Sequence, residues 1–232
     1  MGLLSGGIAE RLAGRWLGSL ADPDGVLSRG WLQKLIRGAV RGQLRRTLCL
    51  TFPAQTLSRL ANAGIGKPAV RSLKEPFGLA VLPPSDALAV RTFNSVALFM
   101  ASLFALGRTL RLPCLAVAPE ASWIWFLPAI RALVLLDNVR VITVDLCRYG
   151  DCRRRPVCIM AVHCSLDVFR DQRCSGTGVC STTGQPHWGW RRQARPPPGR
   201  LWPAPFADTV ASVLVQATRA AQGRRLQRFF GC

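Results

Sequence analysis

The chain has 232 residues, of which 49% are hydrophobic, and this content is ample for a core and unlike that of a disordered protein. Its longest apolar run, 96–106, is about half of the roughly 20 residues that a membrane span requires, and Glu10 and Arg11 interrupt the N-terminal apolar stretch, so neither a membrane segment nor a secretion signal is predicted. With 31 Lys and Arg against 12 Asp and Glu, the net charge of +19 favours polyanions, nucleic acid before an anionic membrane.

Two amphipathic helices are predicted near the N-terminus, over residues 3–18 and 27–40. A strand follows over 46–52, with the sequence RTLCLTF, and ends at Pro53. The stretch 55–85 is irregular because glycine and proline punctuate it throughout.

A long helix and a short buried strand form the centre of the predicted domain. Apolar residues recur at threes and fours over 87–106, which is the period of a helix, and the run 114–117 has the length of a strand buried on both faces. The turn after this strand lies at its carboxyl end, where open α/β sheets bind ligands. Residues 117–122 are therefore expected to border any site.

The remaining elements alternate in type. A helix over 127–136, strands over 139–146 and 157–162, and a last amphipathic helix over 206–222 are predicted. This alternation predicts an α/β fold with a mostly parallel sheet and flanking helices. The predicted organisation is a leader (1–21), an α/β domain (22–184), a basic proline-rich linker (185–204), and a C-terminal helix with a basic tail (205–232).

The order of several short segments resembles a divergent branch of the cytosine-5 DNA methyltransferases, found in phages and in mobile-element polyproteins. These segments are LTFPAQTLSRL, VRSLKEPFGL, LPCLAVAPEASWIWFLP, DLCRYGDCRRRP, RCSG and WPAPFADTVASVL, between about residues 22 and 214. A family segment similar to CQYGD-x-R-x-KPT is matched by Cys147, Tyr149, Gly150, Asp151, Arg153 and Pro156, with Arg155 where the family has Lys. The resemblance implies a Rossmann-like fold that binds S-adenosylmethionine.

The residues that the family uses for catalysis are replaced in this chain. The reaction needs a thiolate that adds to C6 of a flipped cytosine, and the matching position holds Ala54. The positions of the family's Glu and Asn hold Val117 and Ala118, although Pro119 keeps the last place of the triplet. The resemblance therefore implies a degenerate, catalytically inactive relative.

The cofactor site implied by the family is also incomplete. Ser5, Gly6 and Gly7 are the candidates for a remnant of its glycine-rich loop. Only 38 residues separate Gly7 from Arg46, whereas the loop, two strands and two helices need roughly 60 on ordinary element lengths. The chain is thus expected to be truncated at its N-terminal side and to bind no cofactor, with S-adenosylmethionine as the ligand if the fold is more complete.

Cysteine and histidine residues crowd into one region, and tetrahedral zinc accepts both. They are Cys152, Cys158, His163, Cys164, Cys174, Cys180 and His187. The region contains no C-x-x-C pair, and Cys158 and His163 lie at opposite ends of a predicted strand, so scattered reduced thiols are predicted in place of a metal site. Cys174, Cys180 and His187 stay as the candidates for metal ligands, whereas Cys49 and Cys114 are predicted to lie in the core.

Arginine and aromatic residues alternate in two segments, a pattern that can hold nucleic acid by phosphate contact and stacking. The predicted contacts are Tyr149, Arg153, Arg154, Arg155, Trp188, Trp190, Arg191 and Arg192, with DNA favoured over RNA. A solvated linker and a coding sequence rich in G and C are the alternative explanations of these charges.

Three functions follow from these observations: an inactive methyltransferase-like remnant that retains nucleic-acid binding, a basic accessory module of a mobile element, and a decayed reading frame. Nine cysteines without a secretion signal indicate reduced thiols and a nuclear or cytoplasmic protein. The oligomeric state stays open.

Overall fold

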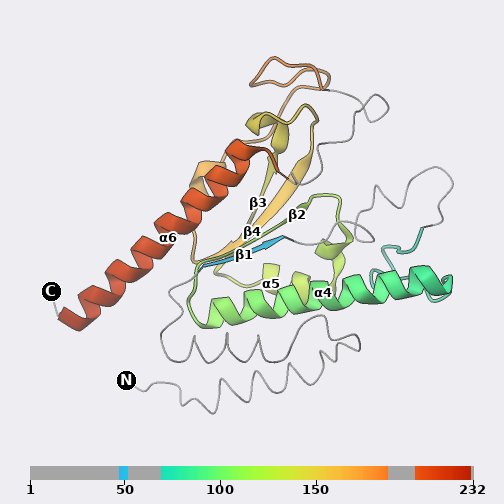
Figure 1. Cartoon of the computed structure of the whole chain (residues 1–232), viewed down its shortest axis with the longest axis horizontal. Helices are drawn as coiled ribbons and strands as arrows, with labels where there is room; N and C mark the ends of the chain where they lie inside the picture. The colour runs from blue at the N-terminus through green and yellow to red at the C-terminus, as the bar shows by residue number, and fades with distance from the viewer. Residues whose placement is uncertain (1–46, 52–68, 188–201, 231–232) are drawn as a thin grey trace, which may run out of the picture.

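Four strands form a single sheet in the computed structural model of the chain, which describes residues 47–51, 69–187 and 202–230 (Figure 1). In spatial order the strands are β1 (Leu48–Thr51), β2 (Cys114–Pro119), β4 (Pro156–Val162) and β3 (Val139–Asp145). Helices α4 (Pro84–Thr109) and α6 (Ala204–Phe230) lie on opposite sides of these strands. The predicted α/β class is therefore confirmed.

The directions of the strands correct the prediction of a mostly parallel sheet. Strand β1 pairs with β2 in parallel, but β4 pairs antiparallel with both β2 and β3. The physical reason is the link 146–155 between β3 and β4, because a parallel connection needs a crossover of about a dozen or more residues. Strands β1, β2 and β3 consequently run the same way, and β4 is inserted between two of them in reverse.

Helix α4 is the crossover between β1 and β2. Proline at its first position and Asp86 in the first turn suit a helix N-terminus, and Arg108 in the last turn suits the opposite end. Its side chains Ala97, Ala101 and Phe104 are buried against the sheet. The helix predicted over 87–106 is thus confirmed and extends a little at each end.

Both faces of the sheet are covered, and successive side chains of β2 point alternately to the two faces. Cys114, Ala116 and Ala118 belong to the apolar cluster under α4, which also holds residues of the 3-10 helix η1 (Trp123–Phe126) and of α5 (Pro128–Val134). Leu115 and Val117 belong to the cluster under α6. Alternate residues of one strand therefore serve two separate cores.

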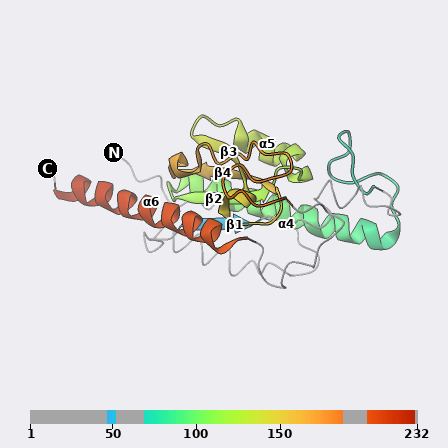
Figure 2. The same ribbon diagram turned by 90° about the horizontal axis from the view of Figure 1, so that it is seen from above.

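The aromatic ring of Phe206 anchors α6 on the second face of the sheet. It packs edge-on against Tyr149 at 5.2 Å and Trp202 at 5.4 Å between ring centroids, and it also contacts Phe169 of the 3-10 helix η3 (Asp167–Phe169). The C-terminal part of α6 extends past the sheet (Figures 1 and 2). The N-terminal part of α6 therefore packs in the core, whereas its C-terminal part does not cover the sheet.

The predicted strands 46–52, 139–146 and 157–162 and the helices 127–136 and 206–222 are confirmed by β1, β3, β4, α5 and α6. The helices predicted over 3–18 and 27–40 lie outside the described residues. Cys114 is buried as predicted, but Cys49 is exposed because β1 is the edge strand of the sheet.

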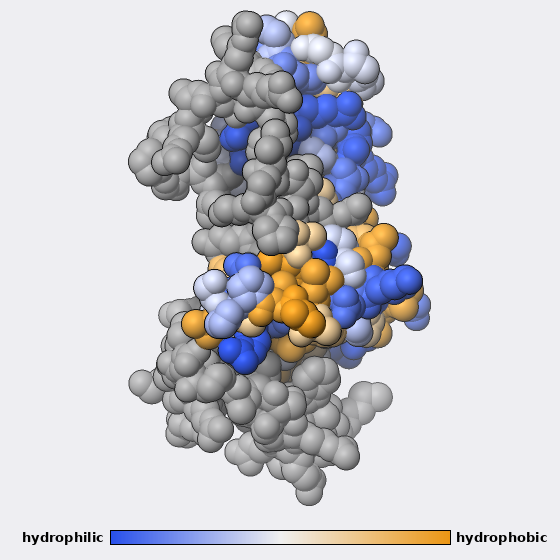
Figure 3. Space-filling view, turned by 90° about the vertical axis from the view of Figure 1, so that its right-hand side faces the viewer, coloured by the Kyte–Doolittle hydropathy of each residue, from blue (hydrophilic) through white to orange (hydrophobic). Residues whose placement is uncertain are grey.

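Apolar side chains are exposed around the beginning of α4. They are Leu73, Phe77, Val81 and Leu88, and the view from this end of the helix shows an apolar patch among hydrophilic side chains (Figure 3). Helix α4 is also, among the described residues, the one helix long and apolar enough to cross a membrane, a test that core helices of soluble proteins pass as well.

Candidate metal centre

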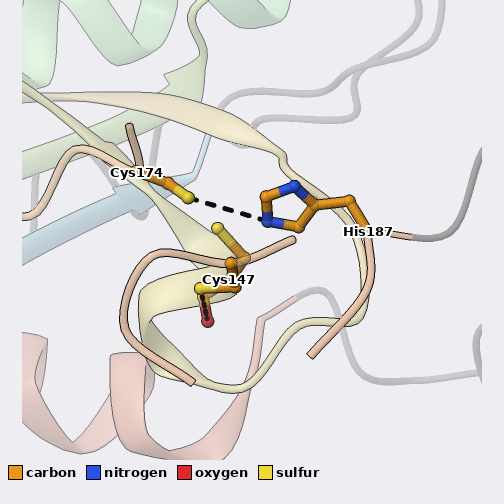
Figure 4. Close-up of side chains that lie close together, drawn as sticks. Cys147, Cys174 and His187 are labelled. Carbon is orange, nitrogen blue, oxygen red and sulfur yellow. Dashed lines mark hydrogen bonds between the residues drawn. The ribbon is translucent and has the colours of Figure 1, made fainter. Parts of the chain in front are cut away.

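Three cysteines and one histidine meet at the end of the sheet where β3 stops. The Sγ atoms of Cys147, Cys174 and Cys180 and a ring nitrogen of His187 all lie within 4.8 Å of one another. In Figure 4 the side chains of Cys174 and His187 point toward each other, and their Sγ and Nε2 atoms are 3.7 Å apart. The three cysteines are buried and pack together in a small cluster separate from the two main cores.

Cys147 comes from the turn that follows β3. This turn is the 3-10 helix η2 (Leu146–Tyr149), and it ends at Gly150 in the left-handed conformation with φ of 89°. The backbone N–H of Gly150 donates to the carbonyl of Cys147 at 3.2 Å, and that of Asp151 donates to Leu146 at 3.1 Å. A glycine is favoured at this position because side chains rarely tolerate that φ, and the closed turn keeps Cys147 next to the end of β3.

Cys174 is tied to the end of β3 by a buried carboxylate. The backbone N–H of Asp145 donates to the carbonyl of Gln172 at 2.9 Å, and the Asp145 Oδ2 accepts the backbone N–H of Cys174 at 2.8 Å. These two bonds fasten the segment after η3 to the strand that precedes Cys147. Two potential ligands that are far apart in sequence are thereby brought to one place.

A short hairpin supplies Cys180 and His187. Val179 and Pro186 form an antiparallel bridge, the N–H of His187 donates to Gly178 at 2.7 Å, and the N–H of Cys180 donates to Gln185 at 2.7 Å. The hairpin turns over Gly184, whose φ is 68°. Its two arms consequently carry one ligand each to the same side.

Hydrogen bonds to sulfur prepare two of the thiols for the charged form. Burial alone raises the pKa of Cys180, but bonds from the hydroxyl and N–H of Thr183 and the N–H of Thr182 outweigh it and lower the pKa to about 6. Burial likewise opposes ionisation of Cys174, but its sulfur accepts from the N–H of Ser181 at 3.4 Å and from the Ser181 hydroxyl at 3.5 Å, and its pKa falls below the ordinary value. Two sulfurs of the cluster are therefore suited to act as thiolates.

The third thiol behaves in the opposite way. Burial raises the pKa of Cys147 to about 12, and the hydrogen bonds that its protonated form makes with Cys174 and Cys180 add to the rise. Without a cation, one shared proton on Cys147 thus compensates the neighbouring thiolates. A zinc ion that replaced this proton would balance most of the negative charge of the three thiolates.

The donor set fits a tetrahedral zinc ion. Zinc bound by three thiolates and one imidazole has Zn–S bonds of about 2.3 Å and a Zn–N bond of about 2.0 Å, so its ligand atoms lie about 3.5–3.8 Å apart. The distance of 3.7 Å between Cys174 and His187 falls in this range. Four protein ligands fill the tetrahedron, which is typical of structural and not of catalytic zinc.

Sequence reasoning identified Cys174, Cys180 and His187 but predicted no site, and it placed Cys147 in the methyltransferase-like segment. The spacing hid the set, because 26 residues separate Cys147 from Cys174. One signal was present in the sequence: Cys174, Cys180 and His187 lie in a short segment with three glycines, Gly176, Gly178 and Gly184. The fold brings the fourth ligand to them.

The residues predicted to contact DNA and the degenerate catalytic positions lie elsewhere. Val117 and Ala118 are buried in β2, and Tyr149 packs on Phe206. Arg153 and Arg155 pair with Asp151, and Arg154 pairs with Asp145. The predicted residues that lie outside the described part of the chain are Ser5, Gly6, Gly7, Ala54, Trp188, Trp190, Arg191 and Arg192.

The turn after β2, which was expected to border a site, reaches the same region through one ion pair. Glu120 lies 3.3 Å from Arg173, the residue before Cys174.

Comparisons of the chain with protein-family models, with curated proteins and with solved structures find no match.

Proposed function

We propose that this protein is a zinc-binding α/β domain and that the metal has a structural role in it. The observation that supports this most directly is the gathering of three cysteines and one histidine around a common point. The other described cysteines lie outside this group. Soft thiolates and an imidazole favour zinc over magnesium or calcium, which take oxygen ligands.

The proposed zinc ion would join three segments that few other contacts hold together. Cys147 follows β3, Cys174 follows η3, and Cys180 and His187 lie on a hairpin whose own hydrogen bonds are few. A hairpin of this size is at best marginally stable by itself. Metal ligation would therefore stabilise the end of the domain directly.

The test is metal binding by single-residue variants. The chain is purified with zinc, freed of excess metal, and its zinc content is measured together with the visible spectrum after replacement by Co²⁺. We expect one metal ion per chain and an intense tetrahedral Co²⁺ spectrum with sulfur charge-transfer bands for the wild type. Cys180→Ser and His187→Ala should lose both signals.

Cys152→Ser is the matched control, because Cys152 is an exposed cysteine outside the cluster. It should bind metal as the wild type does. Metal-free wild-type protein, or a Cys180→Ser variant with unchanged metal content and spectrum, would overturn the proposal.

A second candidate function is DNA binding, and the charge of the chain favours it. A net charge of +19 attracts polyanions at any ordinary ionic strength. The end view of the molecule also shows a mainly hydrophilic surface over its upper part, the side on which the loop with the metal ligands lies (Figures 1 and 3). We also propose a nuclear or cytoplasmic location, because cysteines stay reduced in these compartments.

We propose that the protein is related to the cytosine-5 DNA methyltransferases but has no methyltransferase activity. The common direction of β1, β2 and β3 supports a Rossmann-like relationship, and the reversed β4 departs from a purely parallel sheet. Val117 and Ala118 are buried and apolar, so neither offers a proton donor or acceptor to a cytosine. We therefore propose a remnant that binds and does not methylate.

A further inference from the structure

Three arginines lie on the two segments that carry Cys147 and Cys174. Arg154 and Arg155 end the link between β3 and β4, and Arg173 directly precedes Cys174. We call these three residues the arginine rim. Their side chains are 39%, 34% and 44% exposed, respectively. They are thus accessible to a partner, yet each is held by the protein on one side.

The carboxylates that hold the arginine rim are buried beneath it. Asp145, which is 0% exposed, lies 3.4 Å from the Nε of Arg173 and 3.8 Å from that of Arg154. Asp151, which is 7% exposed, lies 2.6 Å from a terminal nitrogen of Arg155. The negative charges therefore face inward while much of the positive charge faces solvent.

The guanidinium groups of Arg154 and Arg173 retain donors for an external acceptor. An arginine has five N–H donors in a planar fork, and each of these contacts to a carboxylate uses only part of that fork. The fork matches the oxygens of a phosphate, and arginines held in place lose less side-chain entropy on binding it. Glu120 is an exposed acid that pairs with Arg173 of the rim.

We infer that the arginine rim is a phosphate-contacting surface for DNA and that the metal centre holds it together. The inference rests on the DNA-binding function proposed above. Zinc bound to both Cys147 and Cys174 would tie the segment of Arg154 and Arg155 to the segment of Arg173. Without it, the two segments are joined mainly through Asp145.

Asp145 links the metal centre and the rim through a single atom. Its Oδ2 accepts the N–H of the ligand Cys174 and also contacts the guanidinium of Arg173. A shift of the Cys174 segment therefore changes the position of Arg173 relative to Arg154. Loss of the metal should for this reason change the arrangement of the rim arginines as well as that of the hairpin.

The experiment measures binding of the zinc-loaded full chain to a fluorescein-labelled single-stranded DNA by anisotropy at several salt concentrations. The rim variant is Arg154→Gln with Arg173→Gln. The control is Arg131→Gln with Arg170→Gln, which removes the same charge from exposed arginines; Arg170 is 74% exposed and pairs with an exposed acid, Asp167. Binding by the basic residues elsewhere in the chain is common to both variants.

For the rim variant we expect weaker binding and a slope of log K against log salt that is smaller in magnitude by about 1.4, which corresponds to two lost phosphate contacts on a single strand. The control should keep a slope close to that of the wild type. Equal losses in the two variants, or unchanged binding by the rim variant, would overturn the inference.

A second arm removes the metal with a chelator and repeats the measurement. Binding by the wild type should fall to the level of the zinc-loaded rim variant, and the rim variant should lose little more. Unchanged wild-type binding after verified metal loss would contradict the coupling between metal and rim. Zinc content is measured in the same samples, so a chain that binds no zinc refutes the metal proposal while the rim variants still report on phosphate contact.

Competition identifies the source of the phosphate. Unlabelled DNA should displace the probe at lower concentration than RNA of the same sequence or vesicles containing phosphatidylserine. If RNA or vesicles compete better than DNA in the wild type but not in the rim variant, DNA is the wrong partner.

Discussion

Gly176 is the residue on which the turn between Cys174 and Cys180 depends most. A Cβ atom built on Gly176 would lie 1.7 Å from the carbonyl oxygen of Val179, a contact that only movement of the backbone can relieve. Gly178, two residues later, has nothing within 4 Å of the same position. The two glycines therefore form a natural pair of test and control.

We expect Gly176→Ala to weaken zinc binding and to lower the free energy of unfolding by about 1–3 kcal/mol, as overpacking does in a tight site. Gly178→Ala should leave both quantities close to those of the wild type. Competition with a chromophoric chelator and thermal unfolding measure the two effects. Gly176→Ala with wild-type zinc affinity would show that the turn does not position the ligands.

The thiols of the cluster predict how zinc affinity depends on pH. Cys147, whose pKa is raised to about 12, keeps its proton at neutral pH, so zinc must displace that proton. Cys180, whose pKa is lowered to about 6, is already a thiolate above that pH and must also lose a proton below it. Protons thus compete with zinc at every pH below these values.

The apparent affinity should therefore rise with pH, by about tenfold per unit for each proton displaced, and more steeply below about pH 6 than above it. Chelator competition at a series of pH values measures this slope. Affinity that does not change with pH would mean that Cys147 is not a ligand.

At the scale of elements, α4 and β2 approach each other closely in the core under α4. A Cβ on Gly107, in the last turns of α4, would lie 2.1 Å from the Sγ of Cys114, which is buried and whose thiol donates to Leu112 at 3.2 Å. Glycine is needed here for close approach and not for an unusual φ. The helix can cross the strand only where it lacks a side chain.

Replacement of Gly107 by alanine should therefore destabilise the protein although alanine is the better helix former. Helix propensity alone would stabilise by about 1 kcal/mol, but overpacking against β2 costs about 1–3 kcal/mol and should outweigh it. Thr92→Ala, at an exposed position of the same helix, should stabilise by a few tenths of a kcal/mol, roughly its propensity difference. Urea unfolding compares the two, and a Gly107→Ala variant as stable as Thr92→Ala would disprove this packing.

The link between β3 and β4 is the element in which fold and proposed function meet. Its closing bond joins the N–H of Leu146 to the carbonyl of Arg155 at 3.0 Å, and Asp151 pairs with Arg155 across it. This short link reverses β4, supplies Cys147 and presents two arginines of the rim. A single connection therefore determines the sheet pairing and the neighbourhood of the candidate site.

At the scale of the whole molecule, positive charge is distributed unevenly along the chain. The described part makes up about two thirds of the chain but holds only 17 of the 31 basic residues. The arginine rim is therefore expected to supply part of the salt dependence of the proposed DNA binding, and basic residues elsewhere in the chain supply the rest. Removal of two rim arginines should weaken DNA binding and reduce its salt slope without abolishing it.

We also expect the whole chain to transfer no methyl group to cytosine. Ala54 lacks a nucleophile, and Val117 and Ala118 lie in the buried core of β2. Incorporation of radiolabelled methyl from S-adenosylmethionine into cytosine-rich DNA measures this directly, and clear incorporation by the wild type would refute it.

The variant Ala54→Cys, Val117→Glu, Ala118→Asn should also be inactive. Glutamate at position 117 would place a carboxylate among the apolar residues under α6, at a cost of several kcal/mol. Circular dichroism and urea unfolding should show a strongly destabilised variant. A stable triple variant that methylates DNA would show that a cofactor site survives.

Local pattern in the sequence determined the elements of this protein, and the tertiary structure decided how they combine. The helix over 87–106 and the strand over 114–117 could be predicted because side-chain periods of 3.6 and 2 are visible within a few residues. Proline and glycine likewise marked the ends of the elements without any knowledge of their neighbours.

The pairing of β4 and the complete ligand set required the folded chain. Both depend on contacts between residues far apart in sequence: β4 pairs with β2 as well as with β3, and Cys147 meets Cys174 only because Asp145 fastens the later segment to the end of β3. No local spacing encodes such contacts, since they follow from which strands pair and where the intervening chain returns. The cysteine that the sequence assigned to a motif thus became, by its place in the fold, the fourth candidate ligand.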